Sequence, residues 1–136
     1  MYLVDTTVWI DYLRGNDTQA VEMLKGLLRH PRSYGICDQI FMELLQGARD
    51  EQGFNTLGEY LGGQPFYEFV DSRQSHVDAA AIYARCRRRG STTRSAFDCL
   101  IAQCAIEHKL TLLHHDRDFL TLAEVVPDLQ QHHFLR

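Results

Sequence analysis

Short apolar segments alternate with longer amphipathic ones along almost the whole chain of 136 residues. The apolar segments that we expect to be strands are residues 2–4, 34–37, 65–70, 110–113 and, at a weak edge, 132–135. Between them, the spacing of apolar residues predicts helices over residues 6–13, 18–30, 38–48, 50–63, 72–89, 95–108 and 119–126. We expect Asp38 to cap the third of these helices. In the fifth we expect Val77, Ala80, Ala81 and Ala84 to face inward, with Gly90 just beyond its end. Strands that alternate with helices form a parallel sheet covered on both faces. We therefore predict an α/β fold, a three-layer α/β/α domain with a central parallel sheet of four or five strands.

The composition favours a single globular domain spanning residues 1–136, because 45% hydrophobic and 24% charged residues are ordinary proportions for such a domain. The four cysteines form no CxxC pair, and the first residues lack the basic leader of a signal peptide. We expect reduced thiols, a cytoplasmic protein and no membrane span. The formal charge of −4 would be near zero without four acids in a metal site, so it does not exclude a nucleic-acid partner.

Four acids stand beside apolar elements that should all lie against the same sheet. They are Asp5, Glu43, Asp98 and Asp116. Ligands of parallel sheets bind beyond the carboxyl ends of the strands, and Asp5 and Asp116 both fall there. Like charges crowded within a few ångströms cannot all stay ionised unless a cation neutralises them. The pattern therefore predicts a metal site, and hard oxygen ligands without His or Cys favour Mg²⁺ or Mn²⁺.

Two of these acids have an ordinary explanation as helix caps. Asp5 is suited to cap the helix that follows it, although Thr6 and Thr7 would cap equally well. Asp98 ends residues 95–98, Ser-Ala-Phe-Asp, which match a capping box. Capping and metal binding can coexist, because the first turn of a helix also points toward the strand ends.

The other two acids also have alternatives. An isolated Glu43 would normally belong to a solvated helix face, but Gly47 lies four residues on and would share that face. A glycine inside a helix costs about 1 kcal/mol relative to alanine, which indicates a need for room. Asp116 could belong to a polar turn in which Asp118 caps the next helix. Asp116 is nearer the strand end, so we expect it to be the ligand and Asp118 to be accessory.

Four segments in this order resemble the PIN-domain ribonucleases, and within them the VapC-type toxins of toxin–antitoxin pairs. These segments are VDTTVWID at 4–11, ELLQG at 43–47, RSAFDCLIA at 94–102 and LLHHDRDF at 112–119. The resemblance covers essentially the whole chain, and it implies that Asp5, Glu43, Asp98 and Asp116 are the catalytic, metal-binding acids. Thr7 stands where the family often has Ser or Thr near the metal. His114 and His115 depart from the Thr or Asn that is frequent before the last acid.

The resemblance further implies an Mg²⁺- or Mn²⁺-dependent endoribonuclease that acts as the toxin of a type II system. It also implies a homodimer and a VapB-like antitoxin. We expect Trp9, Tyr12, Leu24 and Leu28 to offer apolar surface for such contacts. The antitoxin should lay an apolar helix between these N-terminal helices and the helix of Ile40, and send an Arg toward the acids.

Arginines cluster near the end of the helix predicted at 72–89. They are Arg85, Arg87, Arg88 and Arg89, with Arg94 beyond. Cations stabilise helix C-termini by about 0.3–1 kcal/mol each, but four exceed what one terminus needs. We expect Arg94 or Arg89 to bind RNA phosphates.

Two other functions remain as alternatives. A haloacid-dehalogenase-like phosphatase also begins with a strand followed by Asp, but it needs a second Asp where this chain has Thr7. A non-catalytic PIN-like scaffold would have no need for four clustered acids. Measuring whether the activity of the purified protein depends on a metal ion would separate these possibilities.

Overall fold

The computed structural model describes residues 1–90 and 95–136. Within this part of the chain, four strands are formed: β1 (Tyr2–Val4), β2 (Tyr34–Gly35), β3 (Thr111–Leu113) and β4 (Gln130–His132). The helices are α1 (Thr6–Leu13), α2 (Gln19–Leu27), α3 (Asp38–Gln46), α4 (Glu51–Gly62), α5 (Ser72–Arg88), α6 (Ala96–Glu107) and α7 (Arg117–Val125). The alternation predicted from the sequence is thus confirmed.

The strands form one parallel sheet in the order β2-β1-β3-β4. Leu3 of β1 is in register with Gly35 of β2 on one side and with Leu112 of β3 on the other. β1 is therefore a central strand although it is the first to be synthesised. Leu3 and Leu112 are fully buried, as expected for strands covered on both faces.

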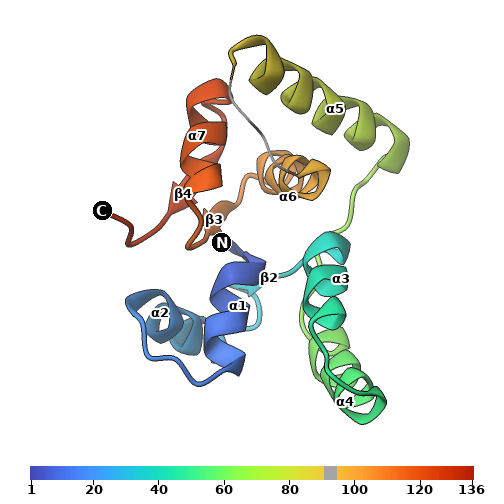
Figure 1. The fold of residues 1–136 in the computed structure, drawn as a ribbon, viewed down its shortest axis with the longest axis vertical. Helices are drawn as coiled ribbons and strands as arrows, with labels where there is room; N and C mark the ends of the chain where they lie inside the picture. The colour runs from blue at the N-terminus through green and yellow to red at the C-terminus, as the bar shows by residue number, and fades with distance from the viewer. Residues whose placement is uncertain (91–94) are drawn as a thin grey trace.

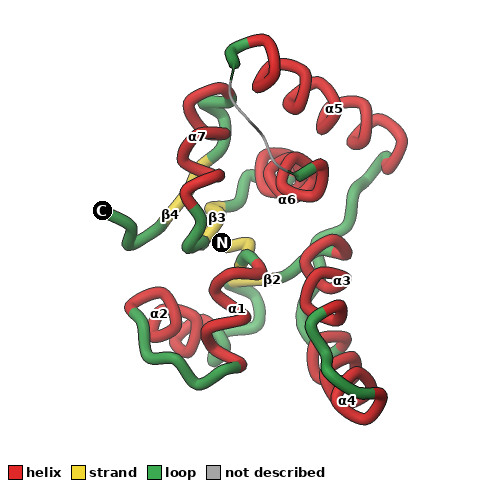
Figure 2. Tube along the Cα trace, viewed as in Figure 1, coloured by secondary structure: helices red, strands yellow, loops and turns green. Residues whose placement is uncertain are grey.

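Helices cover both faces of this sheet (Figures 1 and 2). α1 and α2 lie on one side, whereas α6 and α7 lie on the other, with α5 packed on the outside of α6. α3 and α4 form an arm of two packed helices that extends away from the sheet. The result is the predicted three-layer α/β/α domain with a four-stranded parallel sheet.

The strand predicted at 65–70 is reduced to a single parallel bridge between Phe66 and Ile36. The Ile36 amide donates to the Pro65 carbonyl at 2.9 Å, and the Tyr67 amide donates to the Ile36 carbonyl at 2.8 Å. β2 itself has only two residues, so there is little ladder for a fifth strand to join. The last strand lies at Gln130–His132 rather than at 132–135.

Two predicted helix details were wrong. The third helix begins at Asp38, but its N-cap is Cys37, which makes no side-chain capping bond. In α5 we expected Val77, Ala80, Ala81 and Ala84 to face inward, yet the buried residues are Ser75, Ala79, Ile82 and Cys86. The end of this helix is as predicted, since Gly90 follows with φ +75°, a conformation that favours glycine.

The apolar surface expected from the N-terminal helices is mostly core. Trp9 and Leu24 are fully buried, and Tyr12 and Leu28 are partly buried against the core. The large apolar side chains that are exposed include Leu13 at the end of α1 and Met42, Phe54 and Tyr60 on the arm. No described helix is both long and apolar enough to cross a membrane.

Candidate active site

Asp5 directly follows β1 and is almost completely buried. Its Oδ2 accepts from the Thr7 amide at 3.1 Å and from the Thr7 hydroxyl at 2.7 Å, so it is also the N-cap of α1. The Asp5 amide donates to the Leu113 carbonyl at 2.9 Å, which fixes the acid beside the end of β3. The capping role and a place at the strand ends are therefore combined in one side chain.

Thr7 joins two segments that are 108 residues apart. Its hydroxyl donates to Asp5 and accepts from the His115 amide at 3.0 Å. The expectation that Thr7 would lie beside the acids agrees with this geometry. A single hydroxyl holds the first acid and the connection between β3 and α7 in fixed relative positions.

Glu43 lies on α3 and is held by a contact that the sequence did not suggest. The buried Thr6 hydroxyl donates to Glu43 Oε1 at 2.9 Å. Gly47 is the C-cap of α3 rather than an interior residue, so the energetic cost assumed for it does not apply. Consecutive threonines therefore orient two different acids, Thr6 for Glu43 and Thr7 for Asp5.

Asp98 projects from the first turn of α6. The cap of this helix is Ser95, whose hydroxyl accepts from the Phe97 amide at 3.0 Å. The capping explanation thus applies to Ser95 and leaves the carboxylate of Asp98 to face the other acids.

Asp116 is the N-cap of α7, where its Oδ1 accepts from the Asp118 amide at 2.9 Å. The capping role expected for Asp118 thus belongs to Asp116. The Asp116 amide donates to Nδ1 of His114 at 3.1 Å, and Nε2 of that ring lies 2.8 Å from Oε1 of Gln131. Because Nδ1 accepts, Nε2 carries the proton and donates to Gln131. His114 is fully buried, and burial lowers its pKa, so its ring supports Asp116 as a neutral group.

The three last acids approach one another closely. Carboxylate oxygens of Asp98, Asp116 and Asp118 all lie within 4.8 Å of one another. Asp5 and Glu43 lie near enough to this trio for charge repulsion, which contributes to raising the pKa of Asp98 through Asp5 and that of Glu43 through Asp116. The structure therefore brings together all four acids singled out from the sequence, and it places Asp118 within the tightest group rather than at its margin.

The electrostatics show how crowded these carboxylates are. Burial raises the pKa of Asp98 from 3.8 to about 7, and repulsion by Asp5, Asp116, Glu43 and Asp118 adds to the shift. Burial also raises the pKa of Asp5 to about 6, opposed by the Thr7 hydrogen bonds. The pKa of Glu43 is raised by burial more than its bond from Thr6 lowers it. Such a cluster is strained when fully ionised and would be relieved by a cation.

The donor set fits a hard divalent ion. All the converging groups are carboxylate oxygens, the ligands that Mg²⁺ and Mn²⁺ prefer. An ion bound at roughly 2.1 Å accommodates oxygens up to about 4 Å apart, comparable to the spacing of Asp98, Asp116 and Asp118. The residues present would therefore hold such an ion.

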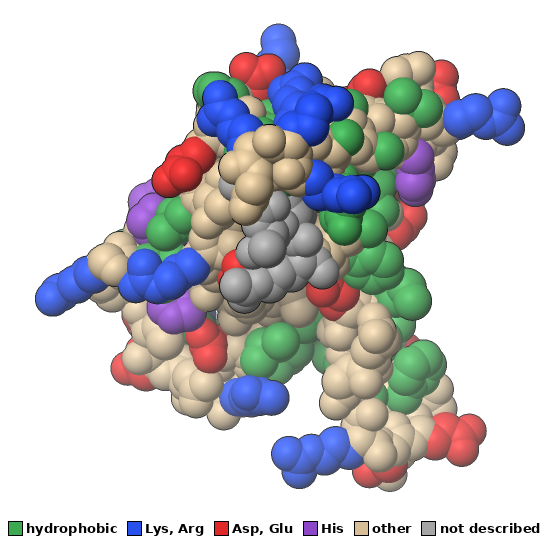
Figure 3. Space-filling model, turned by 45° about the horizontal axis from the view of Figure 1, so that its top comes forward, with side chains coloured by type: hydrophobic (Ala, Val, Ile, Leu, Met, Phe, Trp, Pro, Cys, Tyr) green, Lys and Arg blue, Asp and Glu red, His purple; other side chains and the backbone are tan. Residues whose placement is uncertain are grey.

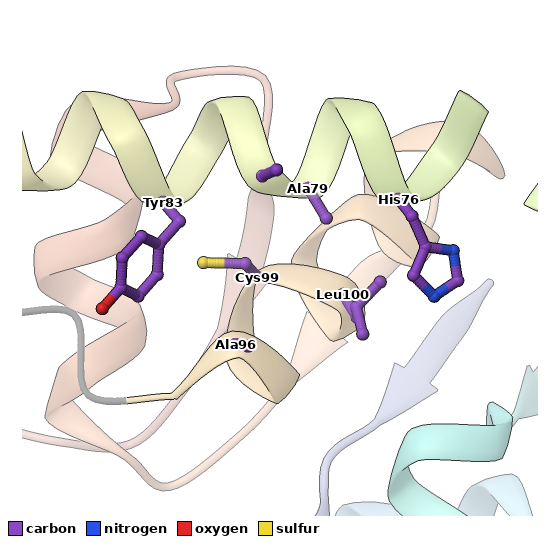
Figure 4. Close-up of a pocket in the computed structure, with 7 residues that line it drawn as sticks. His76, Ala79, Tyr83, Ala96, Cys99 and Leu100 are labelled. Atoms are coloured by element: carbon purple, nitrogen blue, oxygen red, sulfur yellow. The ribbon is translucent and has the colours of Figure 1, made fainter. Parts of the chain in front are cut away.

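A separate cavity of about 360 Å³ lies between α5 and α6 (Figure 4). Its lining residues are His76, Ala79, Ala80, Tyr83, Ala96, Cys99 and Leu100. None of these is a carboxylate, and burial raises the pKa of Cys99 to about 12, so that thiol is not a nucleophile. The chemistry of the molecule is therefore at the strand ends.

Arg89 and Arg94 are the arginines that we expected to bind RNA. The Arg89 guanidinium donates to the Glu124 carbonyl at 3.4 Å, near the end of α7. Arg94 lies outside the described residues. Figure 3 shows basic side chains gathered over the end of the molecule where α5 ends, and Arg85, Arg87 and Arg88 belong to that last turn.

The fold and this set of acids define the class to which the chain belongs. A family model described as the PIN domain matches residues 2–125, so the chain is a member of the PIN domain family. Among curated proteins, it is 38% identical over 126 residues to VapC ribonuclease Mb1587 of Mycobacterium bovis and to ribonuclease VapC11 of Mycobacterium tuberculosis. Each match covers 92% of this chain and 93% of the relative.

Solved structures share the fold. The toxin–antitoxin complex VapBC2 of Rickettsia felis, bound to a promoter DNA fragment, contains a chain with a TM-score of 0.72 at 16% identity, covering 98% of both chains. A chain in VapBC-1 of nontypeable Haemophilus influenzae gives a TM-score of 0.72 at 17% identity, covering 97% of this chain and 96% of that one. At such identities the likeness concerns the fold alone.

Proposed function

We propose that this PIN-domain ribonuclease is an Mg²⁺- or Mn²⁺-dependent endoribonuclease and the toxin of a type II toxin–antitoxin pair. The observation that carries the proposal is the convergence of five acids from four separate segments: Asp5, Glu43, Asp98, and the pair Asp116 and Asp118. The similarity of this chain to named VapC ribonucleases over most of its length supports the ribonuclease activity. Membership of the PIN family disfavours the phosphatase alternative.

The acids have distinct parts in this proposal. Asp98, Asp116 and Asp118 offer the closest oxygens for an ion, while Asp5 is the buried ligand whose orientation Thr7 fixes. Glu43 completes the ring from the side of α3. When bound, a divalent ion supplies an acidified water and stabilises charge that builds on a phosphodiester. Arg89 and Arg94 remain our proposed RNA contacts outside the acids.

A VapB-like antitoxin and a homodimer are proposed as partners, in a cytoplasmic protein. Solved relatives of this fold include VapBC complexes, which supports an antitoxin partner. The hollow between α1 and the arm is lined by Ile10, Leu44 and Leu57 and reaches Glu43. It suits an apolar segment that ends in an Arg directed at the carboxylates.

The test is cleavage of RNA by protein purified free of other nucleases. We expect cleavage with Mg²⁺ or Mn²⁺, none with EDTA, and a loss of at least about 100-fold for Asp5→Asn, because a neutral amide holds a divalent cation poorly. Asp128→Asn, an exposed acid far along the chain, is the matched control. If Asp5→Asn protein cleaved RNA at the wild-type rate, the acid cluster would not be the catalytic site.

A further inference from the structure

A cavity of about 300 Å³ opens beside Glu43, between α1 and the arm formed by α3 and α4. Its lining includes two arginines from different elements, Arg14 at the C-cap of α1 and Arg49 in the loop after α3. Figure 3 shows the molecule hollowed between these two parts, with basic side chains on both sides of the hollow. Cations therefore flank the one approach to the acids that Glu43 borders.

Neither arginine is committed to a carboxylate. Within the part of the chain that the structure describes, the ion pair that is formed joins Lys25 to Glu22. Both arginines are exposed. Two guanidiniums that line the same cavity as Glu43 are thus available to an anion.

We propose that Arg14 and Arg49 form a phosphate subsite for a single strand of RNA whose neighbouring phosphate lies at the acids. The proposal rests on the ribonuclease function proposed above. Five carboxylates repel a polyanion, so a nearby pair of cations is needed to draw the strand in. The cavity suits one strand rather than a duplex, because a volume of about 300 Å³ is too small to hold two paired strands.

The apolar residues that line the rest of the cavity would not distinguish one base from another. Ile10, Leu13, Leu44 and Leu57 supply apolar walls on which a ribose or base can pack, but they offer no hydrogen bonds for reading a base edge. Gly47 leaves the entrance without a side chain, since a Cβ there would meet only the Leu44 carbonyl at 3.4 Å. The subsite therefore recognises backbone and is tolerant of sequence.

A purely structural role must be separated from this one. Arg14 and Arg49 both stand near helix C-termini, where cations are stabilising. That role would change the melting temperature when the arginines are replaced. A phosphate contact would instead change RNA affinity and its dependence on salt, because each contact releases counterions.

The experiment compares Arg14→Gln/Arg49→Gln with the control Arg29→Gln/Arg73→Gln, which removes two exposed arginines that line none of these cavities. Each pair is placed in full-length Asp98→Asn protein, and binding of a labelled, mixed-sequence single-stranded RNA is measured in Mg²⁺ by fluorescence anisotropy over a KCl series. We expect affinity to fall at least about tenfold for the first pair only. The slope of log affinity against log salt should become shallower by about 1.4 for two contacts.

The remaining outcomes decide between explanations. Unchanged affinity and slope, with or without a lower melting temperature, would overturn the subsite. So would variants that bind RNA normally but escape inhibition by the antitoxin, since the arginines would then serve that partner. If wild-type protein cleaves no RNA in Mg²⁺ while the arginines still carry RNA binding, the proposed function fails and the subsite stands.

Discussion

At the scale of single residues, Asp98 is where catalysis and stability are most opposed. It is only partly exposed and is repelled by four other carboxylates. A group whose charged form is disfavoured in the fold weakens that fold whenever it is ionised. We therefore expect the ionised Asp98 carboxylate to destabilise the metal-free protein.

Replacing Asp98 by Asn should remove this destabilisation, because the amide carries no charge. In EDTA at pH 8, we expect Asp98→Asn to raise the free energy of unfolding by at least about 1 kcal/mol, because one pKa unit corresponds to about 1.4 kcal/mol. The same variant should lose RNA cleavage. Urea unfolding followed by circular dichroism measures the first effect, with Asp128→Asn as the control. A destabilised Asp98→Asn protein would show that its carboxylate makes favourable contacts in the absence of metal.

The raised pKa values of Asp5 and Asp98 also predict a pH dependence. Both are near 3.8 in the unfolded chain and rise to about 6 and about 7 in the fold. Their contribution to stability is present below pH 3.8 and is lost as the pH rises through 6–7, because the folded state binds more protons in that window. In EDTA, the unfolding free energy of the wild type should fall from pH 5 to pH 8 more than that of Asp98→Asn. Saturating Mg²⁺ should cancel the difference. Parallel curves for the two proteins would contradict the assignment.

The sequence identified Asp5, Glu43, Asp98 and Asp116 because each stands at a fixed place relative to an apolar element. It did not reveal the roles of Thr6 or His114, since these depend on which side chain lies opposite in space. Thr6 donates to Glu43, 37 residues away, and His114 is oriented by Gln131. Nor did it show how close Asp118 comes to Asp98, which the cap made by Asp116 decides.

At the scale of elements, the misassigned face of α5 has a physical cause. The helix is rich in alanine and has no sharp apolar stripe, so its buried face is set by what it packs against. Ser75 is buried because its hydroxyl donates to Glu107 of α6 at 2.5 Å, whereas Val77 is 57% exposed. Residues 65–70 similarly read as a strand, but the neighbouring two-residue β2 allows only one bridge.

The connection between β3 and α7 depends on the Thr7 hydroxyl, which bonds to the His115 amide and to Asp5. Thr7→Val removes the bond to Asp5 and leaves the His115 amide without its acceptor. We expect kcat for RNA cleavage to fall at least about tenfold, since a lost hydrogen bond to a charged group is worth about 1.5–3 kcal/mol. Thr7→Ser keeps the hydroxyl and should retain most activity, which kinetic assays of both variants will show. A loss in Thr7→Ser as large as that in Thr7→Val would show that the hydroxyl alone does not carry the effect.

At the scale of the whole molecule, three of the large apolar side chains that are exposed lie on the arm. Met42, Phe54 and Tyr60 are 53%, 47% and 40% exposed. Leu13, which is 42% exposed, lines a hollow together with Tyr60. The N-terminal residues first expected to provide a contact surface are largely in the core. The arm therefore offers apolar surface to a partner.

We expect a homodimer or antitoxin contact to bury this arm. Replacing both Phe54 and Met42 by Ser should weaken association at least about tenfold, with little change in fold stability because both side chains are exposed. Light scattering after size exclusion, with and without co-expressed antitoxin, measures the assembly. Val70→Ser, which is 90% exposed outside the arm, is the control. Unchanged association of the double variant would place the interface elsewhere.

The central place of β1 determines when the enzyme can become active during its own synthesis. β1 emerges first from the ribosome, yet its partner β3 and the hydrogen bond from Asp5 to Leu113 require more than 100 further residues. A nascent chain that has reached Gly90 carries Asp5 and Glu43 but none of the three acids that lie closest together. The acid cluster that we propose to cleave RNA therefore cannot form beside the ribosome until this later segment has been synthesised. The proposed ribonuclease would thus become active only near the end of its synthesis, the stage at which the proposed antitoxin could first bind the folded site.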